Sequence, residues 1–112
     1  MNILSDHNIP NSLRINSKCR YLVEVNEISE FKNLYRFINE QKKPIFILGE
    51  GTNIIPTNYF DGIVIKPKFN HIKFDNIKST VSVGSSVNWH YFVEKMIANN
   101  IYGYENLSLI PG

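Results

Sequence analysis

Apolar and polar positions along the chain follow two periods, one typical of strands and one typical of helices. Residues 21–25 (Tyr-Leu-Val-Glu-Val) are rich in β-forming side chains and predict a strand. Over residues 28–41, apolar side chains recur at the spacing of one helical face, at Ile28, Phe31, Leu34, Tyr35 and Ile38. Asn26 is the expected N-cap of this helix. Lys42-Lys43-Pro44 supplies the positive charge and the proline that end it.

A series of shorter elements follows the first helix. Residues 45–48 are expected to form a short buried strand, and the order strand, helix, strand predicts a βαβ unit with parallel pairing. Further strands are expected over residues 62–66, 72–75 and 80–83. A second helix is expected over residues 88–99, with an inner face formed by Trp89, Phe92, Val93, Met96 and Ile97. Residues 101–112 are expected to be extended or looped.

Together these elements predict an α+β fold made of two small lobes. The first lobe is expected to reach about residue 67, and the second to begin near residue 70. We find no internal repeat and no low-complexity linker in the sequence.

A small-residue loop, Gly49-Glu50-Gly51-Thr52-Asn53, joins the strands over residues 45–48 and 62–66. Glycines on both sides of one residue let the backbone take positive φ and turn several N–H groups toward one point. Such a concavity binds an anion, most often a phosphate or pyrophosphate. The Thr52 hydroxyl and the Asn53 amide add polar groups to it. The alternative interpretation is an ordinary glycine turn between two strands.

This loop does not match the Rossmann dinucleotide fingerprint, which requires Gly-x-Gly-x-x-Gly at the opening of a helix. Ile54 stands at the third glycine position, and Pro56 with Asp61-Gly62 prevents a long helix from beginning there. The sequence therefore predicts a nucleotide-binding loop of a different kind, whose backbone N–H groups meet the phosphates without a lysine. Glu50 is expected to contribute its backbone only, with its carboxylate pointing away from the anion.

Four segments, in the same order, resemble one enzyme family. Residues 11–15 (N-S-L-R-I) are similar to the family's N-T-F-G-I, and residues 49–53 (G-E-G-T-N) to its G-E-G-S-N. Val83-Gly84 with Asn88-Trp89-His90 matches V-G-x-x-x-N-W-H, and residues 103–112 (G-Y-E-N-L-S-L-I-P-G) resemble G-L-E-N-L-A-L-I-P-G. The family is UDP-N-acetylenolpyruvoylglucosamine reductase, also called UDP-N-acetylmuramate dehydrogenase. The resemblance covers nearly the whole chain from about Asn11.

The resemblance implies an FAD-binding domain of the PCMH or vanillyl-alcohol-oxidase type over residues 15–112, incomplete at its C-terminus. FAD would lie between the two lobes, with its pyrophosphate on the Gly49–Asn53 loop. The backbone of residues 110–112 would approach the flat flavin ring. The expected cofactor-binding residues are therefore Gly49, Glu50, Gly51, Thr52, Asn53, Ile110, Pro111 and Gly112.

The implied reaction is an NADPH-dependent reduction in peptidoglycan precursor synthesis. NADPH reduces the flavin, which passes hydride to the enolpyruvyl group of UDP-N-acetylglucosamine enolpyruvate and gives UDP-N-acetylmuramate. The resemblance places the family's arginine, proton-donating serine and glutamate beyond the segments matched here, the last in a substrate domain that we expect to be absent from this chain. We therefore expect no catalytic residue in these 112 residues and no activity from the chain alone. A non-catalytic nucleotide-binding module and a non-functional remnant of a truncated gene are the alternatives.

Composition and charge argue against a disordered, nucleic-acid-binding or membrane-spanning protein. Hydrophobic residues make up 43% of the chain, as in an ordinary globular protein. The net charge of +2 arises from 12 basic and 10 acidic residues that are interspersed. Lys66, Lys68 and Lys73 form the densest basic group, which we interpret as a solvated strand edge, and we expect no nucleic-acid partner. No run approaches the ~20 apolar residues of a membrane span, and a cytoplasmic protein is expected. The complete enzyme is expected to be a monomer.

Several single residues have a structural interpretation. Cys19 is the only cysteine, so an internal disulfide is excluded and a buried thiol is expected. His7 and His71 have no partners at metal-ligand spacing, and no metal site is predicted. Trp89 is expected in the core of the second helix, and His90 as a hydrogen-bonding residue at the surface or between the lobes. Ser85 and Ser86 are expected to form the turn and cap before that helix.

Overall fold

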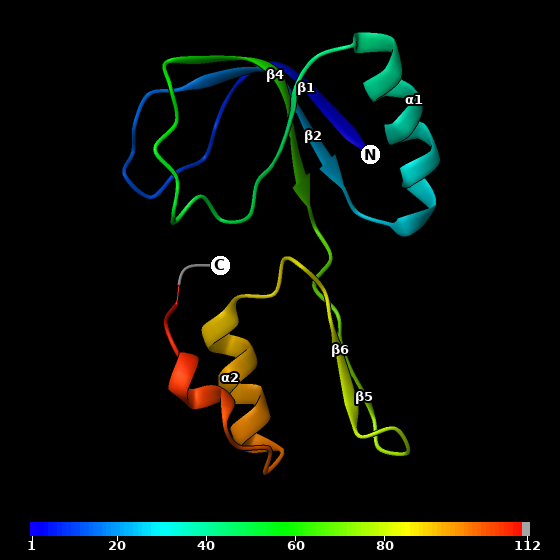
Figure 1. The fold of residues 1–112 in the computed structure, drawn as a ribbon, viewed down its shortest axis with the longest axis vertical. Coiled ribbons are helices and arrows are strands. Elements are labelled where there is room, and N and C mark those ends of the chain that lie inside the picture. Colours follow the sequence, from blue (N-terminus) through cyan, green and yellow to red (C-terminus); the bar gives the residue numbers. More distant parts are fainter. Residues whose placement is uncertain (111–112) are drawn as a thin grey trace.

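The computed structural model describes residues 1–110 and shows two lobes arranged along the long axis of a molecule of 45 × 33 × 17 Å (Figure 1). The first lobe contains β1 (Asn2–Asn8), β2 (Lys18–Val25), the 3-10 turn η1 (Ile28–Glu30), α1 (Phe31–Gln41), β3 (Ile45–Ile47) and β4 (Tyr59–Pro67). The second lobe contains β5 (Ile72–Asp75), β6 (Thr80–Val83), α2 (Trp89–Ala98) and the 3-10 helix η2 (Tyr104–Leu107). The predicted α+β class with two small lobes is confirmed.

The sheet of the first lobe has the strand order β1-β2-β4-β3. β2 and β3 both run parallel to β4, so the βαβ unit has the predicted strand direction. The prediction that the two strands of this unit pair with each other was wrong, because β4 lies between β2 and β3. β4 is the longest strand, and its residues Gly62 to Ile65 are buried, as expected for a central strand of a parallel sheet. β3 lies at the edge of the sheet and its three residues are exposed, so the prediction of a buried strand was wrong for Ile45–Ile47 and holds only for Leu48.

The N-terminal strand β1 was not predicted from the sequence. It pairs antiparallel with β2, from Asn2 opposite Glu24 to Asn8 opposite Lys18. Five of its seven residues are exposed, and its polar sequence shows no apolar alternation. The strand forms because β2 offers it a hydrogen-bonding edge, and a local pattern does not reveal that edge.

Each face of this sheet carries its own apolar cluster. On one face, Leu34 of α1 packs with Val23, Val25, Ile63 and Ile65. On the other face, Leu22 and Val64 pack with Cys19, Ile9 and Leu48. The Cys19 side chain is buried, as predicted, and burial raises the pKa of its thiol. The second cluster is covered by loops, and one of these is the glycine loop that follows β3.

The start of the first helix differs from the prediction. Glu27 caps η1, in a reciprocal capping box with Glu30, and Asn26 is not the cap. The face of α1 that packs on the sheet is centred on Leu34, with Phe37 and Ile38 partly buried beside it. The predicted inner residues Ile28, Phe31 and Tyr35 are exposed. The 3-10 turn advances by a different angle per residue from an α-helix, so Ile28 does not continue the α1 face. Phe31 and Tyr35 belong to α1 but lie at the margin of the face formed by Leu34, Phe37 and Ile38.

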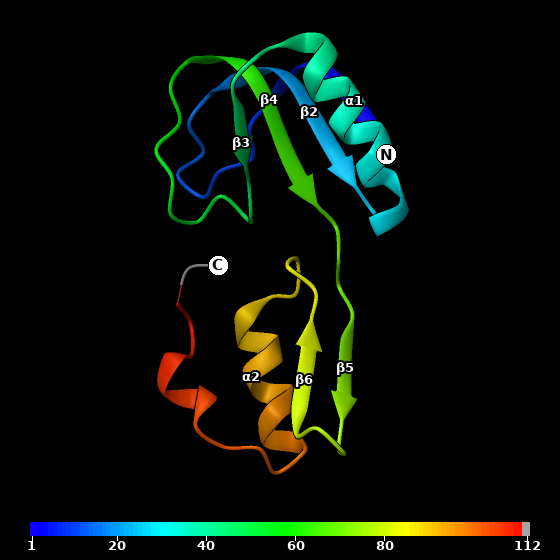
Figure 2. The ribbon, with the colours of Figure 1, turned by 45° about the vertical axis from the view of Figure 1, so that its right-hand side comes forward.

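The second lobe is a β5–β6 hairpin beside α2 (Figure 2). Phe92, Val93 and Met96 are buried as predicted, whereas Ile97 is 43% exposed, so the inner face is narrower than predicted. The tail predicted to be extended or looped contains η2. The Tyr104 ring lies 5.3 Å from that of Phe92 and 6.2 Å from that of Trp89, and these contacts hold η2 against α2.

Candidate functional site

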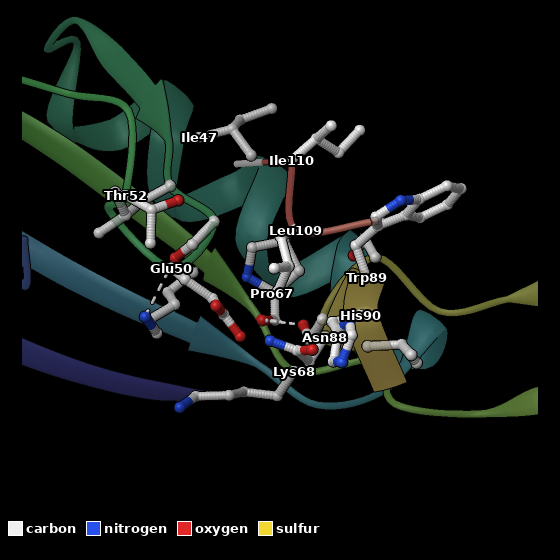
Figure 3. Close-up of a pocket in the computed structure, with 16 residues that line it drawn as sticks. Ile47, Glu50, Thr52, Pro67, Lys68, Asn88, Trp89, His90, Leu109 and Ile110 are labelled. Atoms are coloured by element: carbon white, nitrogen blue, oxygen red, sulfur yellow. Dashed lines mark hydrogen bonds between the residues drawn. The ribbon is translucent and has the colours of Figure 1, made fainter. Parts of the chain in front are cut away.

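A cavity of about 500 Å³ lies where the two lobes meet (Figure 3). Its wall comes from four segments that are far apart in the sequence: residues 47–50 with Thr52, residues 66–68, residues 85–90, and residues 109–110. Figure 3 shows Glu50 and Thr52 on one side, and Trp89 and His90 on the other. The volume is within the range of cofactor pockets.

The parallel strands of the first lobe explain why the glycine loop borders this cavity. β3 and β4 run in the same direction, so their carboxyl ends meet at one edge of the sheet, where ligands of such sheets bind. The Leu48 N–H donates to the Ile65 carbonyl at 2.8 Å and continues the ladder as far as the first glycine. β3 ends on the side of the sheet that faces the second lobe, and the glycine loop follows there (Figure 2).

Gly51 has the positive φ that the sequence predicted, at 73°. A Cβ at this position would lie 2.3 Å from the Pro10 carbonyl oxygen and 2.9 Å from the Asn11 Cα. The Gly51 carbonyl also accepts the Ser12 N–H at 2.9 Å. Only glycine fits, because the backbone of the first resembling segment lies directly against the loop.

Gly49 does not have positive φ, so the prediction of two left-handed glycines in the loop was wrong. Its carbonyl oxygen accepts a hydrogen bond from the Lys66 Nζ at 3.1 Å. The loop conformation is therefore fixed by a lysine at one end and by the close approach of Pro10 at the other, rather than by a symmetric pair of glycines.

The predicted cofactor-binding residues are only partly brought together. Gly49, Glu50, Thr52 and Ile110 line the cavity. Gly51 is buried against Pro10, Asn53 is exposed, and neither residue lines the cavity. Pro111 and Gly112 lie outside the described residues.

Lys66 is the main residue that sequence reasoning missed. It lines the cavity and is half-buried, so the interpretation of residues 66–68 as a solvated strand edge was wrong for this side chain. Burial, and then the charge of Lys68, lower the pKa of Lys66. The signal was present in the period of the strand: Lys66 follows Val64 by two residues and so lies on the same face of β4.

The start of α2 and the tail form the opposite wall. Asn88 is the N-cap, and its Oδ1 accepts the Tyr91 N–H at 3.0 Å; Ser86 instead donates its hydroxyl to the Pro67 carbonyl. Trp89 is half-buried at the wall, and its Nε1–H donates to the Leu107 carbonyl at 2.6 Å, so its predicted place in the core was wrong. The His90 Nδ1 lies 2.8 Å from the Ser108 Oγ. These contacts hold the tail, including Ile110, at the cavity.

Gly84 fixes the junction between the lobes. Its N–H donates to the His71 carbonyl at 2.8 Å, and the Ser86 N–H donates to the Phe69 carbonyl at the same distance. A Cβ on Gly84 would lie 2.3 Å from the Phe69 carbonyl oxygen. The strand that leaves the first lobe is thus joined to the turn that opens α2.

A family model described as "FAD binding domain" matches residues 19–112. The chain belongs to this family. Among residues 1–110, no group of three or more His, Cys, Asp or Glu side chains is placed to hold a metal ion. No helix in the same range is long and apolar enough to cross a membrane.

Two curated relatives of this FAD binding domain are each named UDP-N-acetylenolpyruvoylglucosamine reductase. The protein from Burkholderia multivorans is 31% identical over 117 residues, which cover 100% of this chain and 34% of the relative. The protein from Pseudoalteromonas translucida is 34% identical over 100 residues, covering 88% of this chain and 28% of the relative. The chain therefore spans about a third of the length of these relatives.

The lining residues suit the cofactor for which the family is named. A dinucleotide with a diphosphate and a flat ring system requires polar groups at one part of its site and apolar or aromatic groups at another. The cavity offers the Thr52 hydroxyl and the loop backbone on one wall, and the Trp89 and Ile110 side chains on the other.

Proposed function

We propose that this chain is the FAD-binding part of a UDP-N-acetylenolpyruvoylglucosamine reductase. The observation that carries the proposal is the cavity between the lobes, because three of the four segments that resemble this enzyme family supply its wall. Relatives with this name also match along 88% to 100% of the chain. The proposed domain covers residues 15–112, with a first lobe to about residue 67 and a second from about residue 70.

In this proposal the residues of the chain bind and orient the cofactor. The backbone of Gly49 and Glu50 with the Thr52 hydroxyl would hold the diphosphate, while Trp89 and Ile110 would border the ring system. When bound, FAD would accept electrons from NADPH and supply hydride for the UDP-linked enolpyruvyl substrate. The two lobes would close around part of the cofactor and exclude water from it.

Titration with FAD tests the binding proposal. We expect the 112-residue chain to bind FAD with a dissociation constant weaker than about micromolar, because the affinity must offset the ordering of two lobes joined by few contacts. A ligand that binds only the folded state raises the unfolding midpoint, so saturating FAD should raise the midpoint measured by circular dichroism. A cooperatively folded chain whose midpoint does not move with FAD would contradict the proposal. A non-functional remnant would show no cooperative transition.

We also expect the 112-residue chain to show no reductase turnover when FAD is supplied. The arginine, serine and glutamate that the resemblance assigns to the chemistry have no counterpart among its matched segments. The measurement is NADPH oxidation in the presence of UDP-N-acetylglucosamine enolpyruvate, with one of the longer relatives as the positive control. Substrate-dependent oxidation above the rate of free FAD would show that the assignment of catalytic residues is wrong.

A further inference from the structure

We propose that Lys66 is the electrostatic partner of the cofactor's diphosphate. The inference rests on the proposed function, because it concerns how the same cavity binds an anionic dinucleotide. It replaces the expectation that backbone N–H groups meet the phosphates without a lysine.

The position of the side chain is the first observation. β4 sends Ile63 and Ile65 to the face covered by α1, and sends Val64 to the face covered by the glycine loop. Lys66 continues the Val64 face at the point where the strand leaves the core. Its Nζ lies 3.1 Å from the Gly49 carbonyl oxygen, so the ammonium stands at the start of the loop and lines the cavity with Glu50 and Thr52.

The charges around the cavity are the second observation. Lys66, Lys68 and Glu50 are the lysine and carboxylate side chains of its lining. The Lys68 Nζ forms an ion pair with the Glu24 Oε1 at 3.1 Å, and this interaction is the main cause of the lowered pKa of Glu24. The hydrogen bond described for the Lys66 ammonium goes instead to a neutral carbonyl. An ammonium carries three donors, so this geometry leaves capacity for an anion.

Partial burial makes an incoming anion favourable. Desolvation and the neighbouring Lys68 lower the pKa of Lys66, and the charges of Glu24 and Glu50 offset this only in part. A phosphate group in the cavity would supply a compensating charge and favour the protonated amine. The lysine would at the same time keep its bond to Gly49, and so link the loop conformation to the bound anion.

The test compares FAD binding by the 112-residue chain and three variants across a range of salt concentrations. Lys66→Met should weaken FAD binding roughly tenfold to a hundredfold, the range for a lost hydrogen bond to a charged group. Lys66→Arg should keep most of the affinity because it keeps the charge. Lys78→Met removes the same charge from the exposed β5–β6 turn and should change nothing. Added salt should weaken binding by the parent chain more than binding by Lys66→Met.

The outcomes separate this inference from the proposed function. Absence of FAD binding by the parent chain would overturn the proposed function itself. Binding by the parent chain with equal affinity in Lys66→Met would overturn only the role of the lysine. A purely structural role through the Gly49 carbonyl predicts weaker binding with an unchanged salt dependence, and that result would also overturn the inference. If Lys66→Met does not fold, Lys66→Gln keeps a hydrogen-bond donor without the charge and takes its place.

Discussion

Replacing Gly51 with alanine is expected to abolish measurable FAD binding and to lower the unfolding midpoint by roughly 8 to 16 °C. A non-glycine residue in the left-handed region costs about 1–2 kcal/mol, and Gly51 has a φ of 73°. The new Cβ would also lie 2.3 Å from the Pro10 carbonyl oxygen, a backbone atom that cannot rotate away. A combined cost of about 2 kcal/mol corresponds to this shift at roughly 4–8 °C per kcal/mol.

Gly103→Ala is the matched control for this variant. Gly103 also has positive φ, at 115°, but no atom lies within 4 Å of the position that its Cβ would take. The control therefore carries backbone strain without a collision. We expect a smaller fall in the midpoint and retention of FAD. Equal effects of the two substitutions on both readouts would show that the contact with Pro10 does not shape the loop.

Leu48→Ala is expected to cost roughly 2–5 kcal/mol of unfolding free energy, the usual range for a buried leucine. Leu48 is 2% exposed and packs with Ile9, Leu22 and Val64 beneath the glycine loop. Because the total stability of a small domain is about 5–15 kcal/mol, this loss would be a large fraction of the whole. Urea unfolding followed by circular dichroism measures it. FAD affinity should fall as well, since Leu48 anchors the start of the loop.

Ile55→Ala removes a similar side chain from the far end of the same connection and serves as the control. Ile55 is 82% exposed and does not line the cavity. An exposed substitution away from special features changes stability by no more than about 0.5 kcal/mol. If both variants lost equal stability, the apolar cluster beneath the loop would not be what holds it in place.

The fold was predictable from the sequence where a segment carries its own pattern. β5, β6 and α2 lie close to their expected bounds because alternation, or a helical stripe, is complete within each of them. The strand order was not predictable from such patterns, since it depends on which strand buries both faces. β1 escaped prediction for a related reason: it gains its hydrogen bonds from β2, which lies further along the chain.

The site was predictable in its location and less so in its details. Resemblance and glycine content pointed to the Gly49–Asn53 loop, and four of the six predicted residues that the structure describes line the cavity. The error at Gly49 arose because composition shows where positive φ is permitted, and tertiary contacts decide where it is used. Lys66 was missed because a lysine near a strand end is usually solvated, and only the position of the loop above it brings it into the cavity.

Each lobe contains one residue whose reactivity or fluorescence reports on the unfolding of that lobe. The single cysteine lies in the core of the first lobe, and the single tryptophan, Trp89, lies in the second. A thiol reagent can modify Cys19 only when the first lobe opens, so labelling rates measure the opening equilibrium of that lobe. Trp89 fluorescence follows the second lobe in the same sample without any added label. Comparing the two across a denaturant series therefore shows directly whether the lobes unfold as one cooperative unit or in succession.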